Sequence, residues 1–333
     1  MSDFDFEDFI DFFGENENTI KTTEIRDLFD SIYQWIARKN QGAIIYGKPR
    51  VGKTRALELL SKELQQKYGE QYPVYILYLS GQDNIGKTER YFYVEMLRAL
   101  HQVSSRNETA QTLKRRIINT ISADAVATNT RTAVLIVDEA QYMDNSRYSW
   151  LKAIYDELKH GDAKSDTKGI SLVVLLVGMD NLMKIRQQYI HSESSYIAAR
   201  FMTKTFQFSG IKGPESMMEI LKVINDELDY FVDGERINVM KQLFPKSFAN
   251  GKSLLQLAVP IWDAFNNYAK KLAGVKLSDE TFKVKEITMQ AFMNCITMIF
   301  QEYSAYSASG EEVWPTKALI KKCVEESGFD VTG

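Results

Sequence analysis

Residues 47–54 read Gly47-Lys48-Pro49-Arg50-Val51-Gly52-Lys53-Thr54. Two glycines, a lysine and a threonine stand at the spacing of a phosphate-binding loop. An apolar run precedes the loop at 43–46, and a helical pattern follows from Arg55, so the loop leaves a strand and opens a helix. Backbone N–H groups at such a helix start bind phosphate, and the helix dipole favours its negative charge. The stretch therefore predicts a P-loop nucleotide-binding fold.

Two side chains of the loop have the chemistry that a triphosphate needs. We expect Lys53 to reach the outer phosphates and Thr54 to place its hydroxyl on Mg²⁺, a hard cation that prefers oxygen ligands. The predicted cofactors are ATP and Mg²⁺. The predicted ATP-binding residues of this stretch are Gly47, Lys48, Pro49, Arg50, Val51, Gly52, Lys53, Thr54 and Arg55.

Helical patterns separate five short apolar runs between positions 42 and 208. This alternation is typical of a parallel sheet with helices on both faces. The third and fourth runs are continuous in Val, Ile and Leu, which favours central strands, whereas the alternating fifth run favours a half-exposed strand. The sequence therefore predicts a three-layer α/β fold with a five-stranded parallel sheet, the strands being 43–46, 74–79, 133–137, 172–177 and 203–208.

The segments that flank this region differ from it in composition. Residues 1–21 are acidic and aromatic, and we expect their rings to pack on the chain's own domain, a partner-binding peptide being the alternative. After Gly213-Pro214 the chain reads as helices to its end, a lid followed by C-terminal helices. The predicted domains are an arm over 1–21, a nucleotide-binding core over 22–212 and a helical region over 213–333. Residues 161–169 read as an exposed loop.

Composition excludes several classes of protein. The 333 residues are 44% hydrophobic and 26% charged, which is typical of a globular chain rather than a disordered one. Cys295 and Cys323 lack the spacing of zinc ligands, and two cysteines do not make a disulfide framework. The acidic start lacks the positive region of a secretory signal, and no apolar run reaches the roughly 18 residues of a membrane span. We therefore expect a cytoplasmic protein without a membrane partner.

A second motif follows the third predicted strand, where residues 134–141 read Val134-Leu135-Ile136-Val137-Asp138-Glu139-Ala140-Gln141. An acidic pair after a strand is by itself more often a helix N-cap. Together with the loop at Gly47, the catalytic interpretation is favoured: Asp138 holds Mg²⁺ through its water shell, and Glu139 orients and deprotonates the attacking water. Kinases of small metabolites usually lack this glutamate, so the pair favours an Mg-dependent ATPase.

The two motifs and the strand Leu175-Leu176-Val177-Gly178-Met179 resemble those of AAA+ ATPases, and within them the TnsC/TniB family of transposition regulators. The resemblance covers about residues 20 to 270. The loop and the Asp-Glu pair are specific for the ATPase class, while the assignment to the transposition family rests on a less specific spacing of residues. Origin-binding and helicase-loading ATPases share most of the pattern.

The resemblance implies three further nucleotide-site residues. A sensor residue follows the fourth strand of these ATPases, and Asn181 takes that place here, with a helix cap by Asp180 as the alternative. A trans-acting arginine precedes the fifth strand, which corresponds to Arg200; a surface ion pair is the alternative. Lys252, in Gly251-Lys252-Ser253, resembles a second sensor, although these folds more often carry arginine there.

Contact with double-stranded DNA is also implied, because in similar regulators the surface after the second strand faces DNA. A ring or filament repeats a weak site many times, so a few basic side chains per subunit add up to a salt-sensitive affinity. A solvated helix face is the alternative for each residue, and two neighbouring arginines of one helix cannot point the same way. The candidates are Lys87, Arg90, Lys114, Arg115 and Arg116.

The resemblance thus implies an ATP-dependent regulator that oligomerises on double-stranded DNA. In transposons, including CRISPR-associated ones, such a protein links a TniQ-like target selector to recruitment of transposase subunits for DNA integration. One alternative is an ATPase of the helicase-loader or initiator kind. Another is a signalling NTPase that binds no DNA.

Overall fold

The computed structural model describes residues 5–14, 20–67, 72–79, 88–160, 169–228, 230–232 and 235–331. The chain forms two compact units. The sheet unit consists of Asp27–Gly47 and Ala56–Phe208. The helical unit consists of Met1–Arg26, Lys48–Arg55 and Ser209–Gly333. Most of the phosphate-binding loop, from Lys48 onward, therefore belongs to the helical unit.

The sheet unit is built on five parallel strands, as predicted. Their order is β2-β3-β4-β1-β5, which places β2 and β5 at the edges. Every residue of β3 is buried, whereas three of the four residues of β5 are exposed, in agreement with the patterns of the two runs. The strands are β1 (Gly42–Tyr46), β2 (Val74–Tyr78), β3 (Thr132–Asp138), β4 (Ser171–Gly178) and β5 (Lys204–Gln207).

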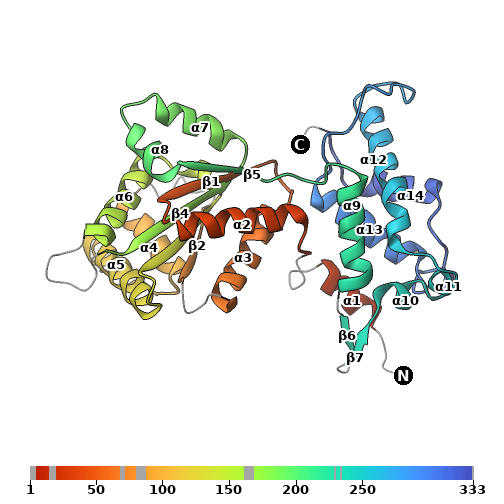
Figure 1. Ribbon diagram of the computed structural model, residues 1–333, viewed down its shortest axis with the longest axis horizontal. Coiled ribbons are helices and arrows are strands. Elements are labelled where there is room, and N and C mark those ends of the chain that lie inside the picture. Colours follow the sequence, from red (N-terminus) through yellow and green to blue (C-terminus); the bar gives the residue numbers. More distant parts are fainter. Residues whose placement is uncertain are drawn as a thin grey trace. The chain divides into compact units, whose positions relative to one another are not determined.

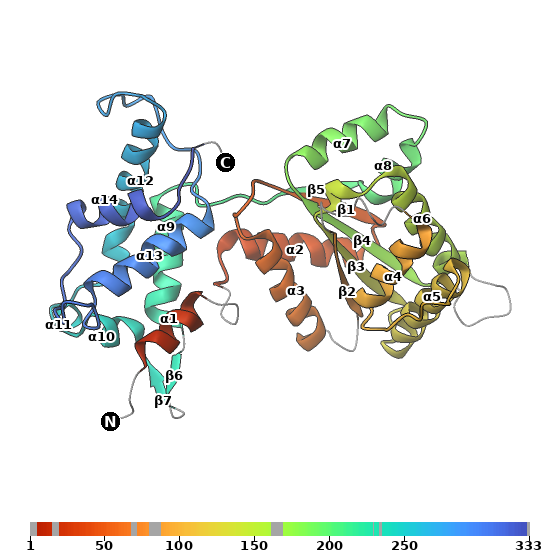
Figure 2. The same ribbon diagram turned by 180° about the vertical axis from the view of Figure 1, so that it is seen from behind.

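Helices cover both faces of this sheet, which gives the three predicted layers. Successive side chains of a strand point to opposite faces, so Leu135 and Leu176 lie in one core with the helices from α4 to α8. Ile136 and Leu175 are buried on the other face, where Figures 1 and 2 show α2 and α3. The helices are α2 (Thr23–Ala37), α3 (Lys53–Lys67), α4 (Glu89–Ala99), α5 (Ala110–Ala127), the 3-10 helix η1 (Ala140–Tyr142), α6 (Asn145–His160), α7 (Asn181–Ile190) and α8 (Ser195–Phe201).

The helical unit confirms the helical C-terminal region. It differs from the expectation in one antiparallel hairpin, β6 (Tyr230–Val232) with β7 (Glu235–Ile237); strands of three residues are too short to show a period. The unit has a core of its own. Its helices are α1 (Phe6–Gly14), α9 (Pro214–Lys222), the π-helix η2 (Val223–Glu227), α10 (Val239–Leu243), α11 (Pro245–Ala249), the 3-10 helix η3 (Leu254–Leu257), α12 (Ala258–Leu272), α13 (Met289–Tyr303) and α14 (Lys317–Glu326).

The acidic aromatic arm forms helix α1 and packs on the helical unit. Phe9 is fully buried, and its ring centroid lies 6.3 Å from that of Phe300 in α13. Phe6 stacks on Tyr306 with centroids 5.3 Å apart. In the described part of the arm, the apolar side of α1 is therefore covered by the chain itself.

Of the predicted exposed loop, residues 161–168 lie outside the described residues. Within the described ranges, none of the helices has the length and apolarity that crossing a membrane requires.

Candidate nucleotide site

The carboxyl ends of the three central strands β3, β4 and β1 lie at one edge of the sheet (Figure 1). Tyr46 at the end of β1 pairs with Gly178 at the end of β4. β3 pairs with the other side of β4 and ends at Asp138. Ligands of open α/β sheets bind at the carboxyl ends of their strands. The phosphate-binding loop and the acidic pair therefore start from the edge where this fold binds ligands.

Gly47 begins the phosphate-binding loop in a position that no other residue can occupy. Its N–H donates to the carbonyl of Gly178 at 3.3 Å. A Cβ on Gly47 would lie 2.0 Å from the carbonyl oxygen of Phe208, far inside van der Waals contact. The first glycine of the motif is thus required by the close approach of the chain after β5.

The rest of the loop curls around its lysine. Lys53 is the first residue of α3 and is only 9% exposed, and its Nζ donates to the carbonyl of Lys48 at 2.6 Å. Arg50 and Gly52 have φ angles of 61° and 105°. Glycine adopts such angles freely, whereas arginine adopts them only with backbone strain. Backbone strain of this kind is common at ligand-binding sites.

This loop fits a nucleotide phosphate chain and an accompanying Mg²⁺ by the chemistry of its donors. The N-terminus of α3 and the Lys53 ammonium supply donors and positive charge for phosphate oxygens. The Thr54 hydroxyl and the Asp138 carboxylate are hard oxygen ligands of the kind that Mg²⁺ prefers.

The segment before α13 holds the loop from the helical unit. Glu286 pairs with Lys48, Oε1 to Nζ, at 3.3 Å, and its Oε2 accepts a hydrogen bond from the Gly210 N–H at 3.1 Å. The N–H of Gln290, in the first turn of α13, donates to the carbonyl of Arg50 at 3.3 Å. The strained residue of the loop is thus stabilised by a backbone hydrogen bond. Sequence reasoning missed Glu286, because nothing near it in the chain links it to the loop.

The acidic pair ends β3 as predicted, and its two members are held differently. Asp138 is buried, and its Oδ1 accepts a hydrogen bond from the N–H of Glu139 at 2.9 Å. Glu139 has φ 55° and ψ 38°, a left-handed conformation rare for glutamate. It stands at the N-cap position of η1, yet its side chain makes no capping hydrogen bond. The N-cap alternative therefore explains its position but not its side chain.

Gln141 fixes the carboxylate of Glu139 instead. Its Nε2 donates to Oε2 of Glu139, and its Oε1 accepts from the N–H of Met179 at 3.3 Å. A Cβ on Gly178 would lie 2.1 Å from that Oε1, so the glycine makes room for the glutamine. The sequence motif included Gln141 but gave it no role; the signal is its place two residues after Glu139, within η1.

The predicted first sensor, Asn181, is the exposed first residue of α7. Asp180 occupies the N-cap position of that helix without a capping hydrogen bond. Among the described residues, the side chain that bonds both Glu139 and the end of β4 is Gln141. Asn181 lies three residues after the end of the same strand.

Arg200, the predicted trans-acting arginine, lies near the end of α8 and is paired within its own chain. Its Nη1 contacts Oδ1 of Asp156, whose other oxygen accepts from Lys152 at 2.7 Å. Its guanidinium lies 4.9 Å from the centroid of the Tyr155 ring. Burial opposes ionisation of Asp156, but the hydrogen bonds from Lys152 and Arg200 outweigh it and hold the pKa of this carboxyl below its usual range. The ion pair weighed as the alternative is therefore present; Arg200 remains 26% exposed.

Lys252, the predicted second sensor, is directed to an aromatic ring. Its ammonium lies 4.9 Å from the centroid of Trp314. Ser253 follows as the N-cap of η3, and its hydroxyl accepts from the N–H of Leu255 at 3.3 Å. Lys252 thus lies just before a helix, as expected. Its ammonium group makes a cation–π contact with Trp314.

The described candidates for DNA contact differ in the partners that they bind within the chain. Arg90 donates to three backbone carbonyls of residues 105–108, and Arg116 donates to the Glu108 carboxylate at 2.7 Å. These two arginines therefore organise the loop between α4 and α5. Lys114 pairs with Glu157 at 2.8 Å. Arg115 is exposed, and Lys87 lies outside the described residues.

Comparison with known families identifies an AAA domain over residues 36–185. The match includes the phosphate-binding loop, Asp138, Glu139 and Gln141, and it stops before Arg200. No match is found among curated proteins. An AAA domain with a phosphate-binding loop indicates a protein that binds and hydrolyses a nucleotide.

Solved structures are similar to this chain to different degrees. The Aeropyrum pernix ORC2 protein, in ADPNP and ADP complexes, is 14% identical with a TM-score of 0.56, over 96% of this chain and 71% of that one. Cdc6p from Pyrobaculum aerophilum is 11% identical with a TM-score of 0.40, over 95% and 88% of the two chains. Drosophila ORC bound to AT-rich DNA and Cdc6 is 10% identical with a TM-score of 0.44, over 88% of this chain and 40% of that one. The first likeness confirms the three-layer AAA+ fold with a helical C-terminal region.

Proposed function

We propose that this chain is an Mg-dependent ATPase that oligomerises on double-stranded DNA and joins a TniQ-like target selector to transposase subunits. The observation that carries the proposal is the pair Asp138 and Glu139 at the end of β3, with Glu139 fixed by Gln141. The pair follows the same edge of the sheet as the phosphate-binding loop. A carboxylate held in this way is suited to act as a base toward water beside a bound triphosphate.

Each side chain has a defined task in this proposal. Lys53 binds the outer phosphates, while Thr54 and Asp138 hold Mg²⁺, which neutralises charge on the phosphates when bound. Glu139 accepts the proton of the attacking water at its carboxylate. Gln141 keeps that carboxylate directed, and Asn181 contacts the terminal phosphate.

Arg200 completes the site of a neighbouring copy. An arginine supplied in trans stabilises charge that develops during phosphoryl transfer and makes hydrolysis depend on assembly. In this step the Arg200 guanidinium leaves the Asp156 carboxylate and binds the terminal phosphate of the neighbour's nucleotide. Lys252 stands ready as a point charge once it leaves Trp314.

DNA contact is assigned to the remaining basic side chains of the surface after β2. Arg115 is exposed and Lys114 pairs only at the surface, so both are available to phosphates. Lys87 is assigned to the same group because it follows β2 in the sequence. Arg90 and Arg116 contribute by holding the loop between α4 and α5 in place.

The test of this function is DNA retention by two variants with and without ATP at low salt. Glu139→Gln should lose hydrolysis and keep ATP-dependent binding to a nonspecific duplex, while Lys53→Ala should lose both. Retention should fall steeply with salt, because phosphate contacts release counterions. A Glu139→Gln variant that never binds duplex DNA contradicts the proposal and favours a signalling NTPase.

An initiator-like ATPase is the second candidate, favoured by the likeness of fold to A. pernix ORC2 over 96% of this chain. Both candidates predict nucleotide-dependent DNA binding, so the partner separates them. Purified transposase and purified replicative helicase should be added in turn to the Glu139→Gln protein on DNA. Retention of transposase alone supports the transposition role, and retention of helicase alone supports the initiator role.

A further inference from the structure

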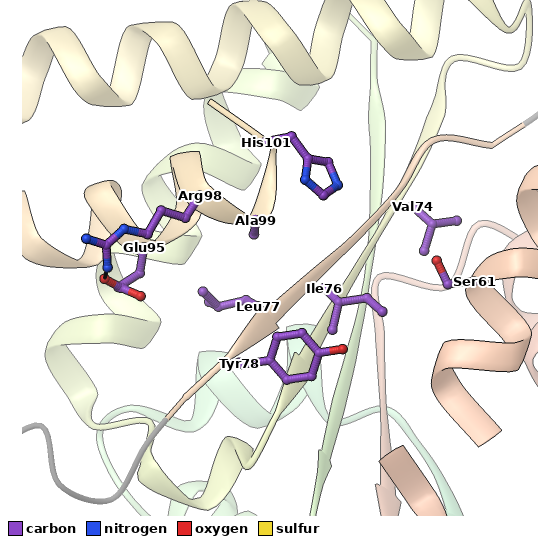
Figure 3. A pocket seen from close by; sticks show the side chains of 9 residues that line it. All are labelled: Ser61, Val74, Ile76, Leu77, Tyr78, Glu95, Arg98, Ala99 and His101. Atoms are coloured by element: carbon purple, nitrogen blue, oxygen red, sulfur yellow. Dashed lines mark hydrogen bonds and ion pairs between the residues drawn. The ribbon is translucent and has the colours of Figure 1, made fainter. Parts of the chain in front are cut away.

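A groove of about 320 Å³ runs beside β2, one of the two edge strands of the five-stranded sheet. Figure 3 shows β2 between two helices, with Ser61 of α3 on one side and the side chains of α4 on the other. Ile76 and Tyr78 of the strand line the groove, together with Glu95, Arg98 and His101. The groove therefore follows the open edge of the sheet.

The backbone of β2 has N–H and C=O groups that point away from β3. Pro73 accepts from the N–H of Val134 at 2.9 Å, and Leu79 donates to the carbonyl of Asp138 at 3.3 Å. In a parallel ladder, alternate residues between these points bond to β3, so the N–H and C=O of Ile76 point away from it. No hydrogen bond joins these outward groups of Val74, Ile76 and Tyr78 to another described residue.

The two edge strands of the sheet differ in how they are protected against pairing with another strand. Proteins protect open edges with charged side chains, proline or bulges. β5 reads Lys204-Thr205-Phe206-Gln207, with a lysine and polar side chains. β2 reads Val74-Tyr75-Ile76-Leu77-Tyr78, without a charge or a proline, and Tyr78 is 54% exposed. An edge left without these devices is suited to be covered by another strand.

The walls of the groove favour one kind of occupant. A strand added to β2 would direct alternate side chains toward α3 and α4. On the α3 side they would meet Ile76 and Tyr78, which are apolar or aromatic. On the α4 side they would meet His101 and Arg98, whose side chain is 67% exposed and pairs at 2.5 Å with Glu95.

We propose that the edge of β2 binds an extended segment of a partner protein as a sixth strand, with apolar side chains toward α3 and acidic side chains toward Arg98. Main-chain hydrogen bonds to Val74, Ile76 and Tyr78 supply affinity, and the two walls supply specificity. The site requires neither ATP nor DNA, so its failure and that of the proposed ATPase are separate results.

The test uses an acetylated octapeptide of alternating valine and glutamate, at about 1 mM because single added strands bind weakly. The readout is amide hydrogen exchange of residues 74–79 in the full chain. The peptide should slow exchange of this segment by about fivefold or more, because it bonds the outward amides. An octapeptide of alternating valine and lysine is the charge control and should have a smaller effect.

Ile76→Pro is the decisive variant. Its N–H points to the open edge, so proline blocks an added strand without removing a bond to β3. Ile76→Ala keeps the N–H and is the matched control; the peptide effect should vanish in the first variant and persist in the second. If Ile76→Pro does not fold, a peptide N-methylated at alternate residues takes its place and should not protect the wild-type segment.

Three results overturn the proposal. The first is no protection by the acidic peptide at this concentration. The second is protection that survives both Ile76→Pro and N-methylation of the peptide. The third is a segment already protected in the free protein, either at all concentrations, which indicates cover by the chain itself, or only at high concentration, which indicates a second copy.

Discussion

Glu139 is held in a left-handed conformation while its carboxylate is bound by a side chain two residues later. Strain of this kind persists where the surroundings fix it, and it is common at functional sites. Gln141 provides that fixation, because it is anchored in turn to the backbone after β4. The orientation of the proposed base thus depends on a neutral residue that has no chemical role of its own.

Gln141→Ala should lower kcat of ATP hydrolysis by about tenfold, since a misdirected base loses part of the contribution of general base catalysis. The dissociation constant for ATP should stay unchanged, because the hydrogen bonds of the Gln141 side chain to described residues go to Glu139 and Met179 and not to the loop. Steady-state kinetics and nucleotide titration measure the two quantities. Gln188→Ala, on the exposed side of α7, is the control; equal losses of kcat and affinity would assign Gln141 a merely structural role.

Glu286 makes two contacts whose contributions are separable. Glu286→Gln keeps an acceptor for the Gly210 N–H and loses only the ion pair to Lys48, which should cost less than about 1 kcal/mol of unfolding free energy. Glu286→Ala loses both and should cost about 1–2 kcal/mol more, because the Gly210 N–H is left without its partner. Urea unfolding of the two variants measures the difference. Equal losses would show that the hydrogen bond contributes nothing.

At the residue scale, the residues that belong to sequence motifs were predictable. The residues that act only through contacts formed on folding were not. The phosphate-binding loop, Asp138 and Glu139 are recognisable because their chemistry requires a fixed spacing. Gln141 and Glu286 act through contacts that no spacing reveals. Charge density alone also did not distinguish Arg115, which is exposed, from Arg116, which bonds Glu108 and the carbonyl of Val103.

At the scale of elements, the five strands were predictable because buried parallel strands read as continuous apolar runs. The residue ranges agree to within about one position at each end, the uncertainty usual for element boundaries. The pairing order was not predictable in the same way, since it depends on contacts between distant runs. Nor was the hairpin β6–β7, whose strands hold too few residues for a period.

Helix α1 shows that an acidic segment can be an integral element. Phe9→Ala should lower the unfolding free energy of the chain by about 3 kcal/mol, the cost typical of removing a buried ring. Phe6→Ala should cost about 1 kcal/mol, because Phe6 is only partly buried and loses one stacked contact. Urea unfolding followed by circular dichroism compares the two. A Phe9→Ala effect no larger than that of Phe6→Ala would mean that α1 is not docked in solution.

At the scale of the whole molecule, the chain places its proposed catalytic parts on different segments. The proposed Mg²⁺ ligand Asp138 and the proposed base Glu139 stand at the end of β3, whereas the phosphate-binding loop follows β1. Arg200 lies on α8, paired with Asp156, and we assign its action to a neighbouring copy. Hydrolysis in this account is therefore a property of an assembly rather than of one chain.

The most direct test mixes two inactive proteins. Lys53→Ala lacks a functional loop but keeps Arg200, and Arg200→Ala keeps the loop but lacks the arginine. ATP hydrolysis by each alone should fall to background, and a one-to-one mixture should regain about a quarter of the wild-type rate, because one interface in four combines both intact parts. A mixture that stays at background, or full hydrolysis by Arg200→Ala alone, would contradict the account.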